Sequence, residues 1–184
     1  FAPFPEVSCV FDNEVVVSAT YHRSTLVSCL VPEAVDPSVS SVVQLSVTNN
    51  GKDLSDDTIS IIYRPTVIAS AIEPMTGTVA GGTKITISAA LSTTFAHSDD
   101  MLCKFGAEGE SRKASWLSAT RVVCTSPTSS AGSALPVFLS VNGGANFVDT
   151  GFEFTFYTPF VISSVLPLAG TMKGNTQVTI SGTN

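Results

Sequence analysis

Long apolar runs and charged residues are both scarce in this sequence. Charged residues make up 13% of the 184 residues, whereas hydrophobic residues make up 43%. The hydrophobic residues are scattered through Ser/Thr-rich sequence, so no segment approaches the roughly 20 consecutive apolar residues that a membrane-spanning helix needs. We therefore expect no membrane insertion in this part of the chain, and we expect its apolar residues to form packed cores.

Basic residues are the scarcer charged class. The chain has nine Lys plus Arg against 15 Asp plus Glu, which gives a formal net charge of −6. Binding to a nucleic-acid backbone requires a clustered cationic face, because the affinity comes from neutralising phosphates and releasing their counterions. We therefore expect no nucleic-acid partner, and we attribute the acidity to solubility.

Histidine is scarce as well, with two residues in the chain. The stretch 97–100, His-Ser-Asp-Asp, contains the letters of a catalytic triad, but adjacent residues cannot adopt the triad geometry. His22 is expected at the surface. The acidic loop 53–57 could bind Ca²⁺, but it lacks the spacing of a preformed calcium loop. The glycine pairs 81–82 and 143–144 fit turns rather than a phosphate-binding loop. These features predict no catalytic residue, no metal site and no cofactor.

The apolar pattern is that of strands, and no segment shows a convincing helical period. Residues 7–11 alternate between apolar and other side chains, as expected of a strand with one buried face. Two hairpins are expected, at 42–63 and 136–157, because each contains an Asn-Gly turn between apolar runs. About seven strands fit into about 95 residues, with turn signals every 8–12 residues. This arrangement predicts an all-β fold of immunoglobulin-like sandwiches.

Cysteine occurs four times, in two blocks of similar sequence. Cys29 follows Cys9, and Cys124 follows Cys103, each after about 20 residues. No Cys-x-x-Cys pair is present, and no histidine lies nearby at ligand spacing, which argues against a zinc site. We predict two disulfides, with reduced core cysteines as the alternative. Each disulfide would close a loop of about 20 residues and contribute roughly 3 kcal/mol. Disulfides also predict an extracellular or cell-surface location.

Aromatic residues keep fixed positions relative to these cysteines. Phe11 and Phe105 lie two residues after the first cysteine of each block, and Tyr21 and Trp116 lie eight residues before the second. We predict that all four belong to the cores, with Tyr21 and Trp116 packed against the disulfides. Ligand stacking is the alternative for these two. The Ser/Thr/Pro-rich segment 125–133 could carry O-linked sugar, but a solvated loop is the simpler interpretation.

A third copy of the repeated pattern begins near the end of the chain. Residues 162–170 match residues 69–77, and residues 174–180 match residues 81–87. The offset is 93 residues throughout, so chance similarity of short strands is excluded.

Taken together, these patterns resemble the IPT/TIG family of immunoglobulin-like domains. The first matching feature is a strand followed by Pro-x-x-Gly. The further matching segments are Gly-Gly-Thr-x-Ile-Thr-Ile at 81–87, Cys-Lys-Phe-Gly at 103–106, Trp-x-Ser-x-Thr-x-Val-x-Cys-x-Ser-Pro at 116–127 and Val-Asn-Gly-Gly at 141–144. The form with paired cysteines and a tryptophan is similar to that of plexin-type and other eukaryotic ectodomains. The first block departs from the pattern, with Tyr21 in place of the tryptophan and Asp12 in place of the glycine.

The resemblance implies a binding or structural module rather than an enzyme. The family has no common catalytic site, and its domains occur in receptor ectodomains, surface proteins, some starch-active enzymes and Rel-type transcription factors. The acidic charge and the expected disulfides disfavour the transcription-factor branch. We therefore expect no enzymatic activity.

The repeat and the resemblance predict three segments. Residues 1–64 would be the C-terminal part of an IPT/TIG domain, 65–159 a complete domain, and 160–184 the first two strands of a further domain. In pattern, residue 184 continues into residue 1. We expect either a portion of a longer tandem chain or strand exchange between separate subunits, with arbitrary boundaries as a third possibility.

The expected partner is therefore the protein itself, head to tail. The leading functional hypothesis is a structural subunit of an extracellular filament, fibre or surface appendage. The alternative is the stalk of a cell-surface receptor or adhesin, which would space a ligand-binding domain from the membrane. A weaker alternative is an accessory module of a carbohydrate-active enzyme.

Overall fold

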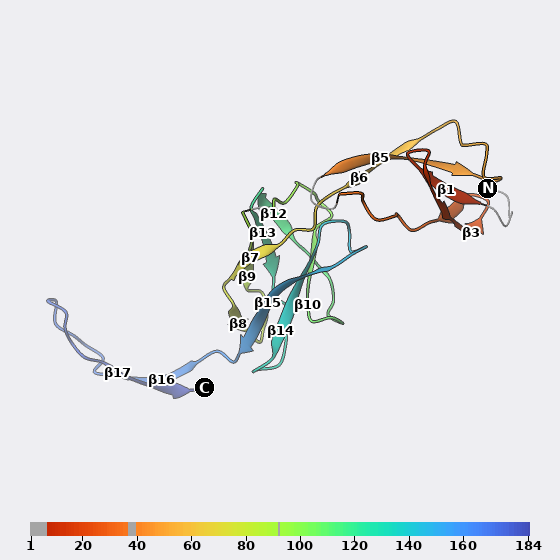
Figure 1. The fold of residues 1–184 in the computed structure, drawn as a ribbon. Coiled ribbons are helices and arrows are strands. Elements are labelled where there is room, and N and C mark those ends of the chain that lie inside the picture. Colours follow the sequence, from red (N-terminus) through yellow and green to blue (C-terminus); the bar gives the residue numbers. More distant parts are fainter. Residues whose placement is uncertain (1–6, 37–39, 92) are drawn as a thin grey trace. The chain divides into compact units, whose positions relative to one another are not determined.

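The computed structural model describes residues 7–36, 40–91 and 93–184, and these residues form 17 strands and no helix. The chain divides into two compact units, Phe1–Thr66 and Val67–Asn184, each of which is described by itself. Figure 1 shows that strands dominate both units. The all-β prediction is confirmed.

The larger unit contains two packed sheets. One has four strands in the order β12-β13-β9-β7, and the other has five in the order β11-β10-β14-β15-β8. The strands are β7 (Ala69–Glu73), β8 (Thr76–Thr78), β9 (Lys84–Ala89), β10 (Leu102–Phe105), β11 (Arg112–Lys113), β12 (Ser115–Ser118), β13 (Arg121–Thr125), β14 (Ala134–Ser140) and β15 (Val148–Tyr157). Two of the nine, β8 and β11, are only three and two residues long, which is why the sequence pattern indicated about seven.

The core lies between these two sheets. Ile85, Ile87 and Val122 of the four-stranded sheet are fully buried. Phe154 and Phe156 of the five-stranded sheet are fully buried as well. The two phenylalanine rings meet edge to face, with centroids 5.0 Å apart. Each such side chain contributes roughly 1.5–3 kcal/mol to the free energy of folding when it is fully buried. The period-two pattern of β9 and β15 thus places one side of each strand in a shared core.

The loop between β9 and β10 also contributes to this core. Phe95 and Met101 are 2% and 0% exposed. The backbone amide of Phe95 donates to the carbonyl of Ala119 at 2.7 Å, which fixes the loop against the β12–β13 turn. The sequence pattern indicated only a loose connection here, because its apolar residues have no regular spacing.

The smaller unit has a sheet of four strands in the order β2-β1-β5-β6 and a separate two-stranded sheet, β3-β4. Its strands are β1 (Ser8–Phe11), β2 (Val15–Ser18), β3 (Thr20–Arg23), β4 (Leu26–Ser28), β5 (Ser41–Thr48) and β6 (Ile59–Tyr63). The pairing repeats that of the larger unit. Cys9 lies opposite Val47, just as Cys103 lies opposite Leu139.

A third element follows the complete sandwich. It is the antiparallel hairpin of β16 (Val161–Leu166) and β17 (Thr179–Thr183). Of residues 160–184, Val165 alone is half-buried, and all the others are exposed. The hairpin therefore has paired backbone but an apolar face open to solvent.

Candidate functional site

Ionisable side chains do not gather into a reaction centre in the part of the chain that the structure describes. No group of three or more His, Cys, Asp or Glu side chains is close enough there to hold a metal ion. His97 lies edge-on to Trp116, with ring centroids 4.9 Å apart. In the acidic loop 53–57, Asp53 accepts a hydrogen bond of 2.7 Å from the Asn50 side-chain amide. These side chains stabilise loops and a core edge.

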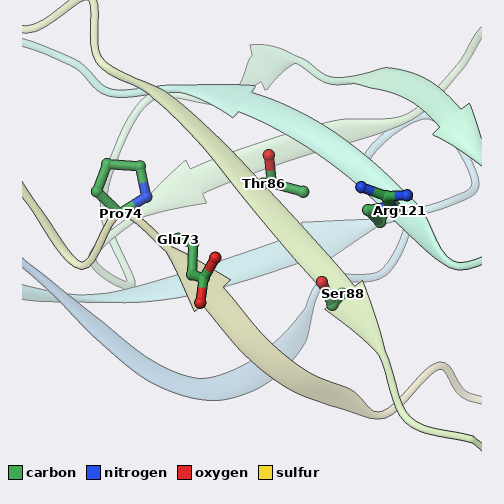
Figure 2. A pocket seen from close by; sticks show the side chains of 5 residues that line it. All are labelled: Glu73, Pro74, Thr86, Ser88 and Arg121. Atoms are coloured by element: carbon green, nitrogen blue, oxygen red, sulfur yellow. The ribbon is translucent and has the colours of Figure 1, made fainter.

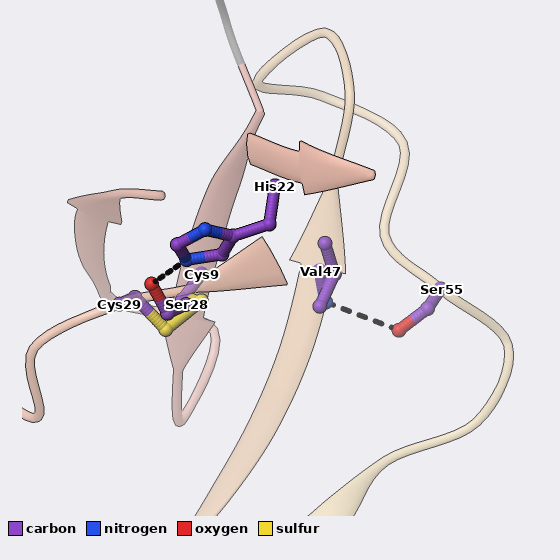
Figure 3. The surroundings of a disulfide bond; sticks show 6 residues. All are labelled: Cys9, His22, Ser28, Cys29, Val47 and Ser55. Atoms are coloured by element: carbon purple, nitrogen blue, oxygen red, sulfur yellow. Dashed lines mark hydrogen bonds between the residues drawn. A yellow bond between two sulfur atoms is a disulfide. The ribbon is translucent and has the colours of Figure 1, made fainter. Parts of the chain in front are cut away.

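The two disulfides, Cys9–Cys29 and Cys103–Cys124, are both present, with Cα separations of 6.4 and 6.2 Å. Figure 3 shows the first of them beside the end of β4, where a hydrogen bond of 2.8 Å links the exposed His22 to Ser28. The second disulfide joins β10 to β13, one strand from each sheet of the complete sandwich. The first joins Cys9 of β1 to Cys29, the residue directly after β4, so each disulfide links the two sheets of its own unit.

Three of the four aromatic residues predicted for the cores are buried or half-buried. Phe11 and Phe105 are 2% and 3% exposed. Trp116 is half-buried against the core, and its indole N–H donates to the carbonyl of Phe95 at 3.1 Å. Tyr21 differs, because its side chain is 36% exposed. The physical reason is that β3 and β4 form a sheet of their own, with no further strand beside it in the described chain.

A polar hollow lies on the outer face of the four-stranded sheet of the larger unit. Figure 2 shows its lining, in which Glu73 and Arg121 lie on either side of Thr86 and Ser88. Its volume is about 510 Å³. The hollow is wide and open, and the two charged side chains are exposed. This shape and lining fit a solvated sheet surface.

A second hollow lies in the smaller unit and contains Tyr63. Asp12, Pro32 and Val43 are among its lining residues. The Tyr63 hydroxyl donates to the carbonyl of Pro32 at 2.8 Å. Burial of the ring, and secondarily the negative charge of Asp12, raise the pKa of Tyr63 above its ordinary value of 10.0. The phenol is therefore a stable hydrogen-bond donor at neutral pH.

The most distinctive surfaces are apolar strand faces that have no second neighbouring strand in the described part of the chain. In the hairpin, Val178 and Ile180 are 48% and 59% exposed, and in β4 Leu26 is 44% exposed. Unpaired strand edges beside exposed apolar side chains favour pairing with another strand. We take the β4 edge and the β16–β17 hairpin as the candidate functional site.

Comparison with known proteins gives the family of the sandwich domain. The model of the family described as "IPT/TIG domain" matches residues 68–156. Residues 68–156 form an IPT/TIG domain. The resemblance inferred from the sequence is thereby confirmed, together with the immunoglobulin-like fold.

A solved structure of the plexin A4 extracellular region shares the fold. The full extracellular region of plexin A4, domains 1 to 10, matches 98% of this chain at 19% identity and a TM-score of 0.51. A second plexin A4 structure, with domains 1 to 8, matches 100% of the chain at 16% identity and a TM-score of 0.46. The chain spans 15% and 25% of the lengths of these two. No curated protein sequence matches.

The IPT/TIG repeat is visible in the sequence, but the exposure of its individual strands is not. The exposed face of Val178 and Ile180 corresponds, by the offset of 93, to Ile85 and Ile87, which are fully buried in the complete domain. The Tyr63 hydroxyl and its carbonyl partner were missed. A tyrosine and a proline about 30 residues apart give no signal in a single sequence.

Proposed function

We propose that this chain is a spacer segment of a cell-surface receptor or adhesin ectodomain. Its IPT/TIG domain has a fold like that of the plexin A4 extracellular region, which is the observation on which the proposal rests. The two disulfides support an extracellular location, because disulfides persist in oxidising compartments. Its role would be non-catalytic: the domains hold a ligand-binding part of the same protein at a distance from the membrane.

The physical properties of the complete domain suit this role. Cys103–Cys124 ties the two sheets together, and removal of a native disulfide from a small extracellular domain typically costs about 2–5 kcal/mol. A spacer must resist extracellular proteolysis and mechanical load. Its resistance to both depends on the rate and the free energy of its unfolding. The disulfide lowers the population of unfolded chain without requiring a larger core.

The filament hypothesis from the sequence finds no support in the comparisons, which agree better with a receptor spacer. The accessory-module hypothesis finds no support there either.

Antibodies raised against the 184-residue chain provide the test. On intact cells of the source organism they should label the surface without permeabilisation. In reducing, denaturing electrophoresis they should detect a polypeptide considerably longer than 184 residues. Labelling that requires permeabilisation, or a native polypeptide of 184 residues, would contradict the proposal.

A further inference from the structure

The outer face of the five-stranded sheet in the IPT/TIG domain has an apolar centre. This sheet has the order β11-β10-β14-β15-β8, so β14 lies in its middle. Val137 and Leu139 of β14 point into the core, where they are 0% and 5% exposed. Because successive side chains of a strand point to opposite faces, Ala134, Pro136 and Phe138 point outward. The solvated face of an antiparallel sheet is normally polar, so three apolar residues on the central strand indicate a contact surface.

The fold itself does not require this apolar centre, as the repeat shows. In the smaller unit β5 pairs with β1 as β14 pairs with β10, which places Ser46 at the position of Phe138. Two residues earlier, Gln44 takes the position of Pro136. The inward position between them is apolar in both units. The repeat thus keeps the inward apolar residue, whereas the outward apolar residues belong to the IPT/TIG domain.

Charges of opposite sign flank the apolar centre. Lys104 of β10, Phe138 of β14 and Asp149 of β15 form one row across the sheet, because each lies opposite the next in the strand registers. Lys113 of β11 and Glu153 of β15 are both exposed and extend the same division. Within its strands, the outer face is therefore basic on one side of β14 and acidic on the other.

Both charges of the row are held in place. The ammonium of Lys104 lies 5.3 Å from the ring centroid of Phe138 and 4.6 Å from that of Phe147. It also donates to a backbone carbonyl at 2.7 Å. The Oδ1 atom of Asp149 accepts a hydrogen bond of 2.8 Å from the backbone amide of Gly151. Side chains that are already ordered lose less conformational entropy when a partner binds, so this row is preorganised for a contact.

We propose that two copies of this chain pair face to face through the five-stranded sheets of their IPT/TIG domains, around a two-fold axis that runs along β14. Such an axis places Phe138 against the same residue of the second copy. It also places Lys104 of each copy against Asp149 of the other. Sheets that pack face to face with nearly aligned strands are a common arrangement, with a spacing of about 10 Å.

The charge pattern selects this axis over the other two-fold arrangement of the same faces. An axis perpendicular to β14 would place Lys104 against Lys104 and Asp149 against Asp149. Like charges that face each other across an interface are unfavourable, so that arrangement is excluded. A face that is basic on one side and acidic on the other is complementary to itself. A second copy is therefore the partner that this face fits, in preference to a partner of uniform charge.

This inference goes beyond the receptor-spacer role and does not depend on it. Rotation about an axis along the strands leaves both copies pointing in the same direction. The pairing is therefore compatible with two ectodomains that extend side by side from one membrane.

Charge reversal on either side of Phe138 tests the pairing. In the 184-residue chain, Lys104→Glu or Asp149→Lys alone should weaken self-association at least about tenfold, because each creates two like-charge contacts in the symmetric dimer. The double variant Lys104→Glu/Asp149→Lys should restore association to within about threefold of the unsubstituted chain, since the reversed charges again face opposite charges. Sedimentation equilibrium over micromolar to near-millimolar concentrations measures the association.

Two substitutions on the other sheet of the same domain are the matched controls. Lys84 of β9 and Glu73 of β7 are exposed there. Lys84→Glu and Glu73→Lys change the net charge by the same amounts as the two test substitutions, but they lie on the opposite face of the sandwich. Each should leave association within about twofold of the unsubstituted chain.

The double variant also separates loss of pairing from damage to the fold. Lys104→Glu removes the contacts with two phenylalanine rings, so its denaturant unfolding is measured beside its association. Within one copy, Lys104 and Asp149 are two strand spacings apart, or about 10 Å. They do not contact each other at that distance, so a fold damaged by one substitution would not be repaired by the other.

Zero-length cross-linking identifies the residues in contact. A carbodiimide joins a lysine amine to a carboxylate only where the two groups meet. A mixture of unlabelled and ¹⁵N-labelled chains should therefore yield linked peptides that combine Lys104 of one isotopic form with Asp149 of the other, as read by mass spectrometry.

Several results would overturn the proposal. A chain that stays monomeric over the whole concentration range would exclude the dimer. Association that the test and control substitutions weaken equally, or that the double variant does not restore, would exclude this face. Links between Lys104 and Asp149 that are absent, or that occur only within one isotopic form, would exclude this axis.

Discussion

At the scale of single residues, neighbouring strands decide the burial of an aromatic side chain. Trp116 and Tyr21 occupy the same place in the repeat, yet Trp116 packs on the core and Tyr21 is 36% exposed. Trp116 lies in a sheet whose next strands, β13 and β9, cover its surroundings. Sequence spacing gave both residues the same position in the strand but could not show whether a covering strand is present.

Tyr63 makes the stability of the smaller unit sensitive to alkaline pH. Its pKa is raised by burial and by Asp12, so the phenol keeps its proton in the folded chain at pH values where the unfolded chain loses it. Stability from this group is therefore fully present below about pH 10 and declines as the pH rises above that value. Denaturant unfolding followed over this range should show the decline.

Tyr63→Phe is the control for this prediction. It should remove part of the alkaline decline and should lower stability at neutral pH by about 1 kcal/mol, because the hydrogen bond to the Pro32 carbonyl is lost. An alkaline decline identical in the variant and the unsubstituted chain would show that other groups cause it.

At the scale of elements, each disulfide is expected to stabilise only the unit that contains it. Replacing Cys103 and Cys124 together by alanine should lower the unfolding free energy of the IPT/TIG domain by about 2–5 kcal/mol. Replacing Cys9 and Cys29 in the same way should leave that domain's transition unchanged, since this pair lies in the other unit. Denaturant titration of both double variants measures the two effects, and a shift of the domain's transition by the second would contradict the assignment.

Most of the strands could be predicted from the sequence, and the exceptions have physical reasons. Period-two apolar residues marked β9, and Asn-Gly turns marked the hairpin loops, because both signals are local. β8 and β11 left no such signal, since strands of two or three residues are too short to show a period. The parallel pairing of β8 with β15 depends on residues far apart in the sequence.

The burial of side chains was less accessible to prediction than the strands themselves. Phe95 and Met101 lie in a loop, and their burial depends on the β12–β13 turn that packs over them. For the candidate site, the offset of 93 residues identified the repeated strands. The exposure of these strands could not be predicted, because a sequence repeat does not show in which copy a strand is covered by an adjacent strand.

At the scale of the whole molecule, residues 68–156 form one IPT/TIG domain, and two further segments, β3–β4 and β16–β17, repeat the strand pairs of its four-stranded sheet. The part of the chain that the structure describes has no helix long and apolar enough to cross a membrane.

Hydrogen exchange of backbone amides tests this account most directly. Amides of β9 and β13 should be strongly protected, because these strands are paired and buried within the complete domain. Amides of β17 should exchange faster in the 184-residue chain, because the residues of this strand are exposed. Amides of β9 and β13 that exchange as fast as those of β17 would contradict the account.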